Sequence, residues 1–166
     1  MGLPKLYHIW VIKKPAGVCV IDAEVSEFDS GNISDGNLVG GLFSSYFSFS
    51  QKMFHEDISI FRTDSYQVSF HVEENYFIAI LTDRKFPKII LRRIVSKFNE
   101  IVTKIHPEIM EEDFDGDLAT YDEITEMIEE ISELRGIKMA KYIRDKKKKA
   151  EKLEKIRELQ DEIEKL

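Results

Sequence analysis

The stretch YQVSFHVEENYFIAIL, residues 66–81, decides how the fold is predicted. From Tyr66 to Glu73, apolar and polar side chains alternate without a break, which is typical of an antiparallel strand with one buried face. Glu74 and Asn75 predict a turn, and the uninterrupted apolar run that follows predicts a more central strand. With a short strand just upstream, residues 57–82 are therefore predicted to form a three-stranded meander.

Toward the N-terminus, residues 6–12 are rich in aromatic and β-branched side chains, and they predict a strand. The sequence Lys-Pro-Ala-Gly at 14–17 predicts a turn, and the apolar residues 18–21 predict the returning strand. Residues 6–22 are thus expected to form a hairpin. Residues 26–37 hold many Ser, Asp, Gly and Asn residues and are expected to be a loop.

Between the hairpin and the meander, residues 38–54 change to the helical period of three or four. Two neighbouring apolar rows give this helix a wide face, which is expected to pack on the sheet. The rows are Leu38, Leu42, Tyr46, Phe49 and Met53, and Val39, Phe43, Phe47 and Phe54. Gly40 and Gly41 each cost a helix about 1 kcal/mol, so we expect the backbone here to approach the sheet or a partner closely.

A second helix is predicted after Pro87, because proline suits the first turn of a helix. Its core-facing row runs from Ile90 to Ile105 at helical spacing, and Pro107 ends it. The compact domain is therefore expected to close near residue 105. The expected core consists of Trp10, Val20, Leu42, Phe49, Val68, Phe70, Ile78, Ile80, Ile94 and Phe98.

These elements predict the α+β class, with a five-stranded antiparallel sheet in the chain order ββαβββα, flanking helices and a charged C-terminal helical extension. The order resembles that of longin and roadblock domains, which share a longin/profilin-like sheet with helices packed on it. The segment LVGGLFSSYFSFSQ, residues 38–51, resembles the first helix of small archaeal longin-like proteins associated with Ras-like GTPases. The hairpin around Trp10 and Gly17 resembles their opening strand pair, and the resemblance covers residues 1–105.

This resemblance implies a non-enzymatic protein-interaction platform. Longin and roadblock domains pair with themselves and with each other, and they occur in vesicle-trafficking complexes and in regulators of Ras-like small GTPases. The expected partner is such a GTPase or another longin or roadblock domain, in a homodimer or heterodimer. We expect the partner to bind the first helix, at Gly40, Gly41, Phe43 and Phe47, and an open sheet edge. The family shares no catalytic residue, so no catalytic role and no cofactor is implied.

Charge divides the chain into three parts. Residues 1–105 carry 12 Lys or Arg and 12 Asp or Glu, whereas residues 106–134 carry 12 acidic side chains and no Lys or Arg. Residues 135–166 carry 12 basic and 7 acidic side chains. We therefore predict a longin-like domain at 1–105, followed by an acidic linker and a helical extension. The linker is residues 106–118, and the extension is residues 119–166.

The extension carries the alternative function. Ile156, Leu159, Ile163 and Leu166 fit the a and d positions of two heptads, fewer than the three or four that argue for a coiled coil. The alternative is a structural protein that oligomerises through this helix, with the domain as a spacer. A SNARE role is disfavoured, because the heptads are not sustained and no membrane anchor follows.

A basic cluster lies in the extension and allows three interpretations. The cluster is Arg144, Lys146, Lys147, Lys148 and Lys149. It could contact an anionic lipid surface peripherally, where each basic residue contributes about 1 kcal/mol. Nucleic acid binding is disfavoured by the sequence pI of about 5.2. We favour a solvated helix face that pairs with the acidic residues of segment 108–133.

Two local motifs are weak candidates for chemistry. Asp113, Asp115 and Asp117 resemble the opening of a calcium loop, but Leu118 stands where that loop needs glycine, so an acidic linker is favoured over a metal site. The cluster His55-Glu56-Asp57 could support a hydrolase only if it lay in a deep pocket. We expect a solvated turn there instead.

A cytoplasmic location is expected. The single cysteine, Cys19, cannot form a disulfide within the chain. No stretch approaches the roughly 18 consecutive apolar residues that a membrane span needs.

Overall fold

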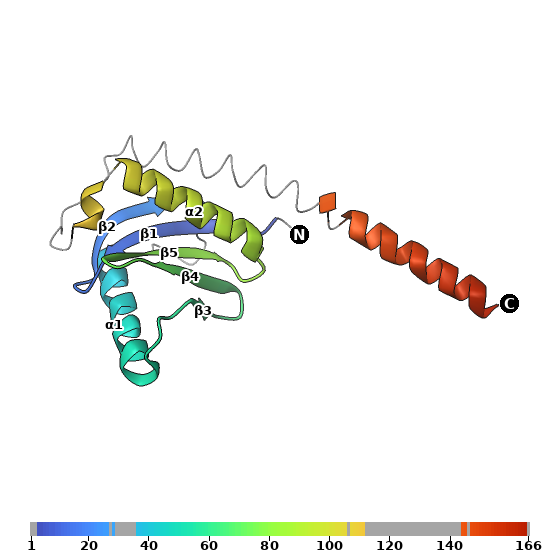
Figure 1. The fold of residues 1–166 in the computed structure, drawn as a ribbon, viewed down its shortest axis with the longest axis horizontal. Coiled ribbons are helices and arrows are strands. Elements are labelled where there is room, and N and C mark those ends of the chain that lie inside the picture. Colours follow the sequence, from blue (N-terminus) through green and yellow to red (C-terminus); the bar gives the residue numbers. More distant parts are fainter. Residues whose placement is uncertain are drawn as a thin grey trace.

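A five-stranded antiparallel sheet lies between two helices in the computed structural model of the chain (Figure 1). The structure describes residues 3–26, 28, 36–105, 107–111, 144–145 and 147–165. The strands are β1 (Leu6–Lys13), β2 (Val18–Glu24), β3 (Ile60–Arg62), β4 (Tyr66–Val72) and β5 (Tyr76–Asp83). The helices are α1 (Gly36–Phe54), α2 (Lys88–Ile105) and the short 3-10 helix η1 (Pro107–Met110). The α+β class, the antiparallel sheet, the hairpin and the meander are thus confirmed.

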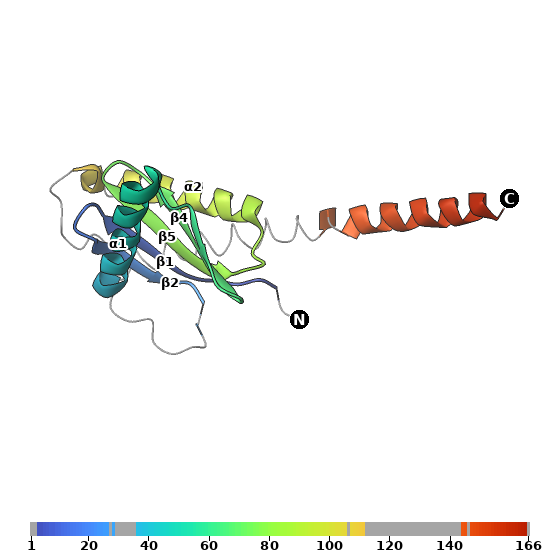
Figure 2. The same ribbon diagram turned by 90° about the horizontal axis from the view of Figure 1, so that it is seen from below.

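The order of strands across the sheet is β2-β1-β5-β4-β3. The central strand β5 and its neighbour β1 pair with Trp10 opposite Ala79, and nearly all their residues are buried. This burial explains their uninterrupted apolar sequence, because a helix lies on each face of the sheet (Figures 1 and 2). β4, on the other side of β5 and flanked only by the three-residue β3, keeps the alternation of apolar and polar residues that a half-covered strand shows.

Two separate cores lie on the two faces of the sheet. On one face, α2 packs the side chains of Ile90, Ile94 and Phe98 against alternate residues of β1 and β5. On the other, α1 packs Phe43 and Phe47 against an aromatic layer. In that layer the ring centroids of Phe47 and Phe77 are 4.6 Å apart, those of Phe47 and Phe70 are 5.2 Å apart, and those of Trp10 and Phe43 are 5.9 Å apart.

Close contact between two glycines fixes α1 against the β1–β2 turn. A Cβ atom placed on Gly40 would lie 2.2 Å from the carbonyl oxygen of Gly17, so no larger residue fits there. Gly17 itself has a φ of 77°, a conformation that favours glycine. The close backbone approach predicted from the glycine pair is confirmed for Gly40. A Cβ on Gly41 would meet nothing within 4 Å.

The expected core was correct except on the outer side of α1. Seven of the expected core residues are buried, namely Trp10, Val20, Val68, Ile78, Ile80, Ile94 and Phe98. Phe70 is partly buried in the aromatic layer. Leu42 and Phe49 are exposed, so their assignment to the core was wrong. The apolar arc of α1 is wider than the sheet surface beneath it, and Phe43 and Phe47 occupy that surface.

The segment after α2 is described only in part. Lys13 Nζ donates a hydrogen bond to the carbonyl oxygen of Glu111, which ties the end of η1 to β1. Most of the predicted linker and the first half of the extension lie outside the described residues, whereas residues 147–164 are helical. Within the described residues, no helix is both long and apolar enough to cross a membrane.

Candidate functional site

A row of large apolar side chains on α1 faces solvent. Leu38, Leu42, Phe49 and Met53 each leave between 51% and 65% of their surface exposed. At about 100° per residue, the four fall within roughly 60° of arc on the helix. They therefore form a continuous exposed row beside the face that packs on the sheet.

The row continues onto neighbouring aromatic residues. Phe54, at the end of α1, packs edge-on against Phe49 with ring centroids 6.2 Å apart. Phe61 on β3 stacks on Tyr46 of α1 at 6.0 Å and is 44% exposed. We call Leu38, Leu42, Phe49, Met53, Phe54 and Phe61 the α1 surface. If each such side chain has about 200 Å² of surface and half is exposed, the patch is roughly 600 Å², the upper end of the range for the largest apolar patch on a typical monomer.

The predicted partner-binding residues of α1 need a correction. Phe43 and Phe47 are buried in the domain's own aromatic layer, and Gly40 lies against Gly17. These three residues contribute to intramolecular packing and present no free surface to a partner. Only Gly41 lies at an open position, next to the exposed row.

The His55-Glu56-Asp57 cluster closes the C-terminal end of α1. All three residues are exposed, and His55 has a φ of 57°, the left-handed conformation common at helix ends. Ser50 Oγ donates to the carbonyl oxygen of Glu56 at 2.7 Å, and Gln51 Nε2 donates to Asp57 Oδ1 at 2.7 Å. These contacts give the cluster a role in ending the helix, as the solvated-turn interpretation predicts.

A groove of about 430 Å³ opens on the other face of the sheet, between α2 and β4. It forms because α2 lies over β1 and β5 and leaves the polar side of β4 uncovered. One side of α2 forms its wall with Lys88, Leu91, Arg92, Val95, Ser96 and Asn99. Ser69, His71 and Glu73, which alternate along β4, line the opposite side.

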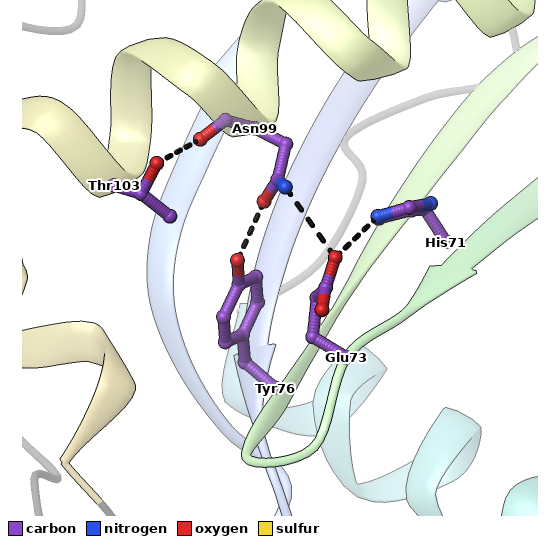
Figure 3. A network of polar contacts seen from close by, with 5 residues as sticks. All are labelled: His71, Glu73, Tyr76, Asn99 and Thr103. Carbon is purple, nitrogen blue, oxygen red and sulfur yellow. Dashed lines mark hydrogen bonds and ion pairs between the residues drawn. The ribbon is translucent and has the colours of Figure 1, made fainter.

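One end of this groove carries a polar network (Figure 3). The buried Tyr76 hydroxyl donates to Asn99 Oδ1 at 2.5 Å, and Asn99 Nδ2 donates to Glu73 Oε1 at 3.4 Å. His71 Nε2 lies 2.7 Å from the same Glu73 oxygen. Burial raises the pKa of Tyr76 from 10.0 to about 12, and the nearby Glu73 carboxylate also raises it.

The weaker sequence candidates lie partly outside the described residues. Asp113, Asp115 and Asp117 are not described, and the residues that are described contain no group of three metal-ligating side chains. In the basic cluster, Arg144 and residues 147–149 are exposed on helical segments, and Lys146 lies outside the described residues.

Sequence reasoning missed the groove altogether. Its side chains come from β3, β4 and α2, and no local spacing connects them. The one available signal was the polar half of the alternation in β4, which predicted an uncovered strand face without saying what lies above it.

No protein-family model matches the chain, and no curated protein matches its sequence.

Proposed function

We propose that residues 1–105 form a longin-like protein-interaction domain, which serves as a non-enzymatic adaptor or regulatory subunit for a Ras-like small GTPase or a trafficking complex. The chain order of the elements, two strands, a helix, three strands and a helix, supports the longin-like assignment. The exposed α1 surface carries the functional proposal, since it offers a partner a large apolar area.

The physical argument concerns water. Removing exposed apolar surface from water stabilises a complex by a free energy of about 25 cal/mol per Å². A patch of roughly 600 Å² approaches the 800 Å² that each partner contributes to a standard interface. Its large aromatic and aliphatic side chains are the kind that anchor interfaces. The nature of the partner follows from the family resemblance.

A pull-down with purified Ras-like GTPases, loaded with GDP or with a non-hydrolysable GTP analogue, tests the proposal. We expect the full chain to retain a GTPase, and the double variant Leu42→Glu/Phe49→Glu to lose it. Ile89→Glu is the matched control, because Ile89 is a similarly exposed apolar residue that stands alone on α2. Retention of the GTPase by the double variant, or no binding in either nucleotide state, would refute the proposal.

A second candidate is assembly through the C-terminal helix. Leu153, Ile156, Leu159 and Ile163 are exposed large apolar residues on the helical segment 147–164, and they could form a coiled-coil seam with a second copy. Light scattering after size-exclusion chromatography separates the two candidates. If Ile156→Asp/Ile163→Asp reduces the mass of an oligomer and Leu42→Glu/Phe49→Glu does not, the helix drives assembly and the domain is the spacer.

A further inference from the structure

We propose that the groove between α2 and β4 binds a small-molecule phosphomonoester, with its phosphate group at the end of the groove near the start of α2. The residues that would hold the phosphate are Arg62, Gln67, Ser69, Lys88 and Arg92, and we call them the anion site. Lys88, Arg92 and Ser69 line the groove directly. Arg62 and Gln67 lie beside Ser69 through strand register, because Arg62 pairs with Gln67 and Ile60 pairs with Ser69.

Two neighbouring donors of the anion site lack an acceptor among the described residues. Gln67 is only 2% exposed, and its Nε2 has no hydrogen-bond partner among the described residues. The amide orientation is fixed, because Arg62 Nε donates to Gln67 Oε1 at 3.4 Å and a guanidinium can only donate. Ser69 Oγ is likewise buried without a partner in that part of the chain. Buried polar groups are normally satisfied, so two neighbouring orphan donors indicate a missing acceptor.

Positive charge surrounds these donors. Lys88 and Arg92 lie one turn apart on α2, and neither has a hydrogen bond or ion pair with any residue that the structure describes. Arg62 adds a third cation from β3. Glu73, the acidic side chain that lines the groove, belongs to the network at the opposite end, where it contacts His71 and Asn99. The two ends of the groove therefore differ in charge.

The number of donors favours phosphate over carboxylate. A phosphate group presents three terminal oxygens and up to two negative charges, whereas a carboxylate presents two oxygens and one charge. Three cations and two neutral donors match the larger group, and the fork of Arg92 can bind two phosphate oxygens at once.

The rest of the groove indicates what the phosphate is attached to. Beyond the anion site, Leu91, Val95 and Ile60 give it an apolar lining. The volume of about 430 Å³ lies within the range of small-ligand pockets. An organic body about the size of an aromatic ring therefore fits between the phosphate and the polar network. This inference is independent of the proposed role of α1, which lies on the other face of the sheet.

Nuclear magnetic resonance titration of the full-length ¹⁵N-labelled protein tests the proposal, with phenyl phosphate, inorganic phosphate and acetate as probes. We expect phenyl phosphate to shift the side-chain amide signals of Gln67 and to bind about tenfold more tightly than inorganic phosphate, because its ring covers Leu91 and Val95. Acetate should bind more weakly than either. Thermal melting should show the same order of stabilisation by the three probes.

Matched variants localise the binding. Arg92→Gln and Ser69→Ala should each weaken phenyl phosphate binding about tenfold. Arg93→Gln is the control, because it removes the same charge from the next position of α2 and Arg93 does not line the groove. An equal loss in Arg93→Gln would show a diffuse charge effect and overturn the site, as would the absence of any shift at about 10 mM phenyl phosphate. Equal binding of acetate would overturn the assignment to phosphate. Melting curves without ligand confirm that each variant is folded.

Discussion

Helices α1 and α2 lie on opposite faces of one sheet, and they differ in how the sheet covers their apolar side chains. In α2, the large apolar residues from Ile90 to Val102 point to the core, and the outer face is charged or polar apart from Ile89. In α1, two inner phenylalanines are covered, while Leu42, Phe49 and their neighbours face solvent. The domain buries nearly all the large apolar side chains of α2, but it leaves a row of them on α1 exposed to solvent.

The two helices differ in the width of their apolar arcs. A helix that only covers a sheet needs an apolar stripe of about 100°, and α2 keeps close to that width. The apolar arc of α1 extends well past its inner row, although burial of the inner row alone attaches it to the sheet. The extra width adds nothing to the domain's own core and faces solvent, where the proposed partner would bind.

The largest effect is expected from truncating the same residue type on the two helices. Phe98 of α2 is fully buried and Phe49 of α1 is 58% exposed. We expect Phe98→Ala to lower the free energy of unfolding by about 3–5 kcal/mol, because it leaves a cavity in the core. Phe49→Ala should cost less than about 1 kcal/mol. Urea denaturation at several protein concentrations measures both.

The concentration series also sharpens the comparison. If Phe49→Ala costs as much as Phe98→Ala, and the cost grows with protein concentration, the α1 surface is already covered in a self-associated form. An equal cost without concentration dependence would break the comparison, because the exposed row would then be part of the core.

Effects of intermediate size are expected for two adjacent glycines of α1, and the two substitutions should change the stability in opposite directions. Gly40→Ala should destabilise the protein by about 1–3 kcal/mol, because the new Cβ would collide with the Gly17 backbone. Gly41→Ala should stabilise it by roughly 0.5–1 kcal/mol, because alanine favours the helix and the added methyl group meets nothing within 4 Å. Thermal melting monitored by circular dichroism measures both signs. Stabilisation by both substitutions would mean that α1 does not rest on the turn.

A small effect at neutral pH is expected on the α2 side, at Tyr76. Tyr76→Phe removes the hydrogen bond to Asn99 and should cost about 1 kcal/mol at pH 7. The folded-state pKa of about 12 lies above the ordinary value of 10.0, so the native state holds this proton more tightly. The stability that it contributes is complete below pH 10 and is lost as the pH rises toward 12.

The wild-type advantage over Tyr76→Phe should therefore shrink and then reverse between pH 10 and 12. Denaturation of both proteins across this range measures the change, and the difference in tyrosinate absorbance between them reports the pKa of Tyr76 directly. Glu73→Gln should lower that pKa only in part, because burial is the larger cause. A constant difference in stability across this range would contradict the burial of the hydroxyl.

Much of the fold could be predicted from periodicity alone. Alternation in residues 66–73 and the apolar run in residues 76–81 set β4 and β5, and Pro87 and Pro107 flank α2. The inner and outer rows of α1 could not be separated, because both are apolar and periodicity shows only that they are adjacent. Which row packs on the sheet depends on the contact between Gly40 and Gly17, residues that are far apart in the sequence.

The groove could not be predicted, for a related reason. Tyr76 and Asn99 are 23 residues apart, and Arg62 and Arg92 come from a strand and a helix with different periods. Each of these side chains has an ordinary explanation in its own segment, as a strand aromatic, a helix polar residue or a solvated charge. These side chains come together only because α2 lies on the face of the sheet that carries the polar side chains of β4.

The pairing of β1 with β5 also has a consequence for the chain during its synthesis. The hairpin of β1 and β2 is complete at Glu24, but β5, which covers the other edge of β1, begins only at Tyr76. At the usual 5–20 residues per second, a ribosome needs roughly 3 to 10 s to make the residues between them. For that interval the nascent hairpin has apolar residues on both faces and no sheet to join. The central strand of the sheet is therefore the last of the five strands that the growing chain can add.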